Sequence, residues 1–232
     1  LKLEGAEFDG LWEYFLEKGI PLPPNLIVAG TVNMDETTHG FSRKVIDRAF
    51  TIDFGVFYPN DFADYFEPTT QPKTLGFPVL SAATRDDLAA IAADAGGVKS
   101  IVFLAAINAV LKTSPFELAY RALNELLLAV VCFQPKDDAE LQAVWDDFLM
   151  TKVLPRIDGD AEKLSADGES SLLTRLQDEI KKQFTVIASS QRPDLLREKI
   201  GGGSCMVDCR SAQKLAWMQE RLRMNGFTTF WP

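Results

Sequence analysis

The residues with the clearest chemical potential lie near the start of the chain, where an apolar run gives way to polar and basic side chains. Leu26–Val32 ends at the amide Asn33, and two arginines, Arg43 and Arg48, precede the next apolar residues. In open α/β sheets, ligands bind beyond the carboxyl ends of the strands. An amide there can orient a water near a phosphate, and an arginine can stabilise charge in a phosphoryl-transfer transition state.

The same spacing also suits ordinary structural roles. Asn33 could be a turn residue, because asparagine favours tight turns. Arg48 could be a salt-bridge partner of Asp47 or Asp53, and both arginines could lie on the surface behind a capped turn. Spacing alone leaves these alternatives open.

Other chemically suggestive residues favour plain structural roles. Asp35 and Glu36 could be mistaken for a catalytic acid pair, but their place before a short helix favours capping. His39 lies in a polar loop and is expected to be a surface residue. The chain has three cysteines and this single histidine, too few well-spaced ligands for a zinc site, so no metal is expected.

The elements that must position the two arginines read as part of an α/β sheet. Leu26–Val32 is short, apolar and β-branched, which predicts a buried strand. A short helix is expected over 43–48, and the alternation that follows predicts a second strand at Thr51–Phe54. A loop and helix between two strands is long enough for a crossover, so we expect the strands to be parallel neighbours in one sheet.

Beyond Tyr58 the pattern becomes helical. A proline-rich connector runs to Pro78, and Gln191–Asp208, which includes the Gly201–Ser204 run, reads as a loop. Apolar periodicity and capping signals predict helices from Thr84 to Gly96, from Val98 to Lys112, from Ser114 to Phe133, from Asp137 to Val153, from Ser171 to Phe184 and from Ser211 to Gly226, and then a strand from Phe227 to Trp231.

Composition limits the partners that this chain could bind. Its 232 residues carry a net charge of −9, a poor match for a phosphate backbone, so we expect any contact with DNA to be made by other domains. The longest apolar stretch falls well short of the ~20 residues that cross a bilayer, so no membrane contact is expected. The odd cysteine count and the absence of a signal peptide favour a cytoplasmic location.

The segment GTVNMDETTHGFSRKVIDRAF, residues 30–50, resembles the sensor-1 to arginine-finger stretch of McrB-like AAA+ NTPases, the motor subunits of modified-cytosine restriction systems. The resemblance implies that Asn33 is the sensor-1 residue. It implies that Arg48 is the arginine finger that acts on nucleotide held by a neighbouring subunit, with Arg43 as the next candidate.

Downstream segments resemble the same family. FELAYRALNELL, residues 116–127, is similar to its lid helix, which implies that Arg121 is a sensor-2, nucleotide-binding residue. KVLPRIDGD, residues 152–160, and RSAQKLAWMQERLRMNGFTTFW, residues 210–231, are similar to its C-terminal portion. The resemblance implies a homo-oligomeric ring that uses ATP or GTP with Mg²⁺, and a partner endonuclease subunit.

This resemblance sets the expected fold class and domains. We expect α/β plus α: the distal part of an AAA+ P-loop-type α/β subdomain over residues 1–60, a connector and helical lid over 61–200, and a terminal helix and strand over 201–232. A MoxR-like chaperone ATPase, which remodels protein partners, and a non-enzymatic helical interaction module are the alternatives.

No GxxxxGK followed by Ser or Thr occurs in the sequence, and no apolar strand ending in Asp-Glu precedes Asn25. The chain begins with Leu1, so we expect it to be a C-terminal fragment of a longer protein. Without a P-loop there is no phosphate cradle and no Mg²⁺ ligand set, and no tightly bound cofactor is expected in the fragment.

We therefore predict that the purified 232-residue chain shows no NTPase activity. Phosphate release from ATP and from GTP should remain at the level of a buffer blank. Turnover that copurifies with the protein and disappears in an Asn33→Ala variant would contradict this expectation.

Overall fold

The computed structural model describes residues 9–20, 22, 26–32, 41–53, 62–74, 81–166 and 170–231. The chain divides into two compact units, Leu1–Asn33 and Met34–Pro232. The described part of the first unit contains helix α1 (Asp9–Lys18). All other elements, and all contacts considered below, belong to the second unit.

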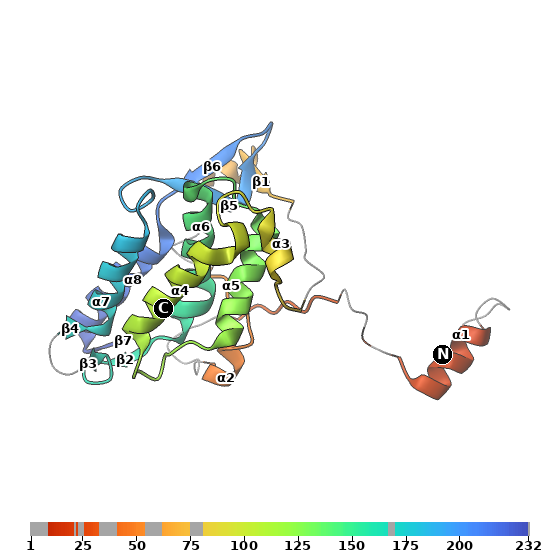
Figure 1. Ribbon diagram of the computed structural model, residues 1–232, viewed down its shortest axis with the longest axis horizontal. Helices are drawn as coiled ribbons and strands as arrows, with labels where there is room; N and C mark the ends of the chain where they lie inside the picture. The colour runs from red at the N-terminus through yellow and green to blue at the C-terminus, as the bar shows by residue number, and fades with distance from the viewer. Residues whose placement is uncertain are drawn as a thin grey trace. The chain divides into compact units, whose positions relative to one another are not determined.

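The five longest helices described in the second unit are α4 (Val98–Leu111), α5 (Tyr120–Phe133), α6 (Asp138–Phe148), α7 (Leu172–Gln183) and α8 (Arg210–Asn225). Figure 1 shows them gathered side by side, and α6 contacts both α5 and α8. Every residue from Leu141 to Phe148 is buried, so α6 is the central helix. The ring of Phe103 stacks on Trp145 with centroids 4.5 Å apart, which joins α4 to α6.

Local capping signals explain where several helices begin and end. Thr84 and Asp87 form a capping box at α3 (Arg85–Ala89), Asp137 accepts from the N–H of Glu140 at the start of α6, and Ser171 caps α7. Gly226 ends α8 with a φ of +71°, a conformation that glycine adopts without strain. The predicted starts at Thr84, Asp137 and Ser171 are confirmed, as is the predicted end at Gly226.

Three predicted helix boundaries are wrong. Helix α8 begins at Arg210, with Cys209 and not Ser211 at the capping position. Helix α3 ends at Ala89, well before Gly96, and a 3-10 turn (η3, Ala95–Gly97) leads into α4. Helix α5 begins at Tyr120, not at Ser114, because Asn108 holds both backbone groups of Leu118. The Asn108 Oδ1 accepts from the Leu118 N–H at 2.7 Å, and its Nδ2 donates to the Leu118 carbonyl at 3.2 Å. These two hydrogen bonds occupy the backbone groups of Leu118, which a helix starting at Ser114 would use for its own hydrogen bonds.

The described strands pair only in antiparallel fashion. β1 (Thr70–Pro72), β5 (Arg192–Lys199) and β6 (Ser204–Val207) form one sheet, which Figure 1 shows at one end of the helices. β2 (Asp158–Asp160) pairs with β7 (Phe227–Thr229), and β3 (Ser165–Ala166) pairs with β4 (Ser170–Ser171). The strand predicted near the C-terminus is therefore confirmed in β7. Short remaining elements are α2 (Arg43–Ile46) and the 3-10 turn η2 (Phe62–Tyr65).

Residues 191–208 form a hairpin, so their prediction as a loop is wrong. Gly201, Gly202 and Gly203 link β5 to β6, each with positive φ, and the N–H of Lys199 donates to the Gly203 carbonyl at 3.0 Å. The domain boundary expected between residues 200 and 201 falls in this loop, between two paired strands.

The two strands predicted in the first 60 residues are not formed in the described part of that region. Leu26–Val32 has no regular structure, and Val28 is 86% exposed. A strand requires a neighbour to accept its backbone hydrogen bonds, and Leu26–Val32 has none among the described residues. Thr51 instead donates its backbone N–H to the carbonyl of Thr151, just after helix α6, at 3.2 Å. The parallel pairing of these segments is therefore wrong.

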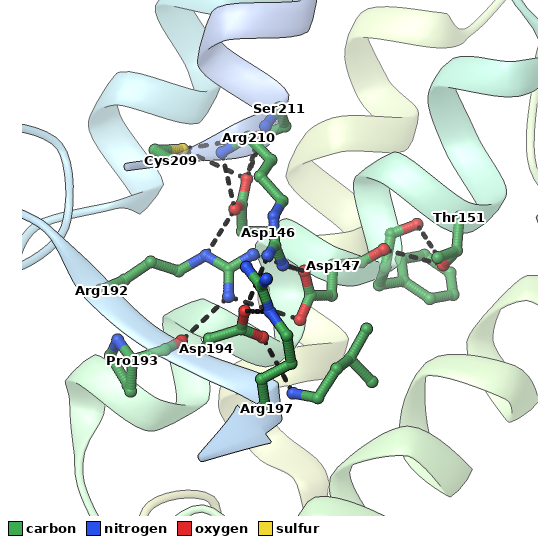
Figure 2. A network of polar contacts seen from close by, with 12 residues as sticks. Asp146, Asp147, Thr151, Arg192, Pro193, Asp194, Arg197, Cys209, Arg210 and Ser211 are labelled. Atoms are coloured by element: carbon green, nitrogen blue, oxygen red, sulfur yellow. Dashed lines mark hydrogen bonds and ion pairs between the residues drawn. The ribbon is translucent and has the colours of Figure 1, made fainter. Parts of the chain in front are cut away.

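A buried ion network fixes the hairpin to the helices (Figure 2). Arg192 of β5 pairs with both Asp146 and Asp147 of α6, and its Nε lies 2.7 Å from Asp146 Oδ2. Arg210 of α8 reaches Asp147 at 3.2 Å and Asp194 at 3.0 Å. The network therefore links β5, α6 and α8 through charges that are removed from water.

Asp146 is the most heavily hydrogen-bonded member of this network. Its carboxylate also accepts from the backbone N–H groups of Arg210 and Ser211, at 3.0 and 2.8 Å, and from the Ser211 hydroxyl and the Cys209 thiol. Burial raises the pKa of Asp146, but the charge of Arg192 and the hydrogen bonds from Ser211 outweigh it, so the pKa lies below its usual range. For Asp147, burial and the neighbouring Asp146 prevail, and its pKa is raised.

We predict that Asp146→Asn lowers the free energy of unfolding by about 3–5 kcal/mol, because it leaves the buried Arg192 charge under-compensated. Asp138→Asn on the same helix is the control. Asp138 pairs with Lys99 on the surface, so its loss should cost at most about 1 kcal/mol. Denaturant unfolding measures both, and equal losses in the two variants would contradict the structural role of the network.

The Asp146→Asn deficit should also depend on pH. Because the folded pKa of Asp146 lies below its usual value of 3.8, its charge stabilises the fold above that pH, and the stabilisation is lost as pH falls through the folded pKa. The difference between the wild type and Asp146→Asn should therefore shrink on acidification.

Candidate functional site

The sequence nominates four site residues, and the structure places three of them on described backbone. Arg43 begins helix α2, Arg48 follows α2 with an exposed side chain, and Arg121 lies exposed in the first turn of α5. Asn33 lies outside the described residues, as do Asp35, Glu36 and His39. The candidate site is therefore built from Arg48, Arg121 and the residues that hold their segments.

Lys152 holds the backbone on both sides of Arg48. Its ammonium donates to the carbonyl oxygens of Asp47 and Ala49, each at 2.9 Å. Lys152 is only 3% exposed, and Ile46, just before this stretch, is buried as well. The backbone around Arg48 is thus anchored to the segment that follows helix α6, while the arginine side chain is exposed.

Glu125 of α5 supplies the charge partner of Lys152. Its Oε2 lies 2.7 Å from the Lys152 ammonium, an ion pair whose alignment falls short of a hydrogen bond. A buried ammonium needs such a partner because its desolvation is costly. The two carbonyls accept hydrogen bonds from the ammonium, and the carboxylate balances its charge.

The carboxylates nearest to Arg48 in sequence pair with other cations. Asp47 Oδ1 lies 3.1 Å from the Nε of Arg156, and Asp53 Oδ2 lies 3.0 Å from the ammonium of Lys214. Within the described residues Arg48 makes no ion pair with either aspartate. The salt-bridge role that the sequence left open for Arg48 is thus filled by Arg156 and Lys214.

Lys214 occupies an aromatic box on α8. Its ammonium lies 4.4 Å from the ring centroid of Trp217 and 4.2 Å from that of Phe230, within cation–π range. Burial lowers the pKa of Lys214, and the attraction of Asp53 only partly opposes this effect. Asp53 is therefore the counter-charge that keeps a cation in this box.

Pro155 accounts for the hydrogen bond that joins Thr51 to Thr151. The chain leaves α6 through a π-helical turn (η4, Leu149–Val153) and a 3-10 turn (η5, Leu154–Arg156). Pro155 has no N–H, so the Thr151 carbonyl lacks the donor that a helix would supply four residues later. That carbonyl accepts from the Thr51 N–H instead.

Among the described residues Arg121 also lacks an ion-pair partner. Glu125, one turn away on α5, pairs with Lys152 instead. Arg48 and Arg121 therefore belong to segments that meet at Lys152.

No metal site emerges from the described residues. They contain no group of three or more His, Cys, Asp or Glu that could hold a metal ion. The carboxylates of the ion network are occupied by arginines, and burial together with Asp146 raises the pKa of the Cys209 thiol to about 12. None of the described helices is both long and apolar enough to cross a membrane.

A shallow apolar hollow of about 360 Å³ lies between α4 and the start of α5. Ile101 and Leu104 of α4 face Tyr120 and Leu123 of α5 across it, and Tyr120 is 90% exposed. This hollow is lined by apolar and amide side chains, so it offers contact area and little chemistry.

Residues 90–227 match the model of a family described as Domain of unknown function (DUF8727). The chain belongs to this family. The matched region includes Arg121, Glu125 and Lys152, whereas Arg48 lies before it. No curated protein and no solved structure matches the chain.

Sequence reasoning missed Lys152, Glu125 and Arg156. Lys152 stands in LMTKVLPRI, an otherwise mostly apolar stretch, and a lysine in such a run signals a buried charge that needs a partner. Its acceptors are more than 100 residues away for the two carbonyls, so no local pattern could identify them.

We predict that Asp53→Asn makes stability depend more strongly on pH. Lys214 then loses the attraction that supports its charge, so its folded pKa falls further below the usual 10.5. The unfolded state then binds more protons than the folded state between these two values, so stability rises with pH there. The deficit of Asp53→Asn relative to the wild type should narrow as pH rises from the lowered folded pKa of Lys214 toward 10.5.

Denaturant unfolding at several pH values measures this effect, and Asp178→Asn, at an exposed position on α7, is the control. A deficit that stays constant over the range would mean that Asp53 does not control the charge of Lys214.

Proposed function

We propose that this chain is the C-terminal portion of a ring-forming AAA+ NTPase motor subunit of a McrBC-like DNA restriction or defence system. The proposal rests on the resemblance of residues 30–50 and on one structural observation. Arg48 is exposed on an anchored backbone, while the neighbouring carboxylates that could neutralise it pair with Arg156 and Lys214.

This arrangement is what an arginine acting across a subunit boundary requires. A finger must project from its own subunit, so its side chain has to be exposed and uncommitted in the absence of the neighbour. Its backbone must also be fixed, because misplacement by about 1 Å can cost about 10²-fold in rate. The bonds from Lys152 to Asp47 and Ala49 supply that fixation.

The proposed chemistry is in-line attack of water on the γ-phosphate of ATP or GTP, with the P-loop and Mg²⁺ in the full-length protein. Arg48 would stabilise the charge that spreads over the γ-phosphate oxygens in a neighbouring subunit. Its planar guanidinium can hold two oxygens at once, which a lysine cannot. Arg121 would contact the γ-phosphate from the lid, and Asn33 would orient the water.

With a net charge of −9, the chain would leave DNA contacts to other domains. The partners would be ring neighbours and an endonuclease subunit.

A second candidate is a non-enzymatic helical interaction module. The apolar hollow between α4 and α5, which includes exposed Tyr120, favours it, because such surfaces commonly receive partner proteins. A module of this kind needs no nucleotide, so nucleotide binding by the full-length protein separates the two candidates.

We predict a mixing effect in the full-length protein. Arg48→Ala subunits should bind nucleotide but hydrolyse it about 10³-fold more slowly or worse. Mixed with subunits whose own P-loop is disabled, they should regain activity, because each defect then lies on a different side of one shared site. Arg85→Ala, at an exposed arginine of α3, is the control and should hydrolyse normally.

Steady-state phosphate release, with size-exclusion chromatography to verify assembly, measures the outcome. If assembled mixtures stay as inactive as either parent, Arg48 does not act in trans and Arg43 becomes the next candidate. A full-length protein that binds no nucleotide would instead favour the interaction module.

A further inference from the structure

Lys152 connects the two segments that carry the candidate arginines. On one side it binds the carbonyls of the residues before and after Arg48. On the other side it pairs with Glu125, which lies four residues after Arg121 and therefore on the same face of α5. One buried ammonium thus touches both the finger segment and the lid helix.

The geometry leaves Lys152 little freedom to release either side. Its ammonium donates to two carbonyls and pairs with one carboxylate, and its side chain is 4% exposed, so water cannot readily replace a lost partner. The backbone around it is equally committed, because Thr151 accepts from Thr51 and Arg156 pairs with Asp47. A shift of α5 at Glu125 must therefore move the ammonium, and with it the carbonyls that flank Arg48.

We propose that Lys152 is a positioning residue that couples the lid helix to the arginine finger, an inference that rests on the proposed function. Movement of α5 on γ-phosphate binding at Arg121 of one site would be transmitted through Glu125 and Lys152 to Arg48, which serves the next site around the ring. The π-helical turn (η4) places Lys152 at this junction, and such turns are frequent at functional sites.

The test uses the full-length protein with ATP and GTP, and compares Lys152→Met with Arg48→Ala. Methionine matches the apolar stem of the lysine side chain but removes the ammonium with its charge and all three donors. We expect Lys152→Met to lower kcat on the order of 10²-fold with KM and nucleotide affinity nearly unchanged. Lys99→Met is the matched control, because Lys99 also links two helices through a carboxylate, Asp138, but lies on the surface.

The double variant separates positioning from a merely structural role. If Lys152 acts through Arg48, then Lys152→Met combined with Arg48→Ala should be no slower than Arg48→Ala alone, because the two changes remove one function. Losses that multiply, or a loss in KM as large as that in kcat, would overturn the coupling while leaving the proposed function intact. An Arg48→Ala variant with normal turnover would instead overturn the proposed function.

Glu125→Gln provides the second test if Lys152→Met fails to assemble. Glutamine keeps the shape of the side chain and leaves the two carbonyl bonds of Lys152 in place while removing its counter-charge. We expect a smaller loss of kcat and faster amide hydrogen exchange over residues 45–51, where Ala49 and Thr51 donate, with α4 unchanged. Unaltered exchange in this segment together with normal kcat would overturn the coupling.

Discussion

The ion pair between Asp146 and Arg192 is the contact on which the second unit is organised. Neither side chain has any exposed surface, so each charge depends on the other for the solvation it has lost. The pair fixes strand β5 against helix α6, and the backbone of Arg210 and Ser211 binds the same carboxylate. The hairpin and α8 therefore cannot leave α6 without exposing or orphaning a charge.

Helix α6 transmits this constraint to the candidate site. Its central residues pack against α4, α5 and α8, and its C-terminal end continues directly into the π-helical turn that carries Lys152. The segment that carries Arg48 is thus held by local turn hydrogen bonds to Val45 and Ile46 and by the buried ammonium of Lys152. A surface arginine with this support can be rigid without being buried.

Sequence reasoning succeeded where the signal is local. Thr84, Asp137, Ser171 and Gly226 mark helix ends because their effects involve groups within four residues. It failed at the hairpin because the inward positions Arg192 and Asp194 are charged and looked solvated, and their partners lie far along the chain. The prediction of a strand at Leu26–Val32 failed because a strand forms only by pairing with a second strand.

The candidate site divides in the same way. Arg48 and Arg121 are candidates because the sequence around each resembles a family motif, and their functional roles stay predictions. Lys152, Glu125 and Arg156 were missed because their significance lies in contacts between segments that are distant in sequence.

Pro155 also determines which N–H group binds the carbonyl oxygen of Thr151. Helices normally satisfy their own carbonyls, so a docking segment has nothing to bind. By withholding one N–H, Pro155 leaves the Thr151 oxygen open to the Thr51 N–H. The missing N–H of Pro155 thus determines where the Thr51 segment binds. Any other residue at position 155 would supply an N–H that competes with Thr51 for the Thr151 oxygen.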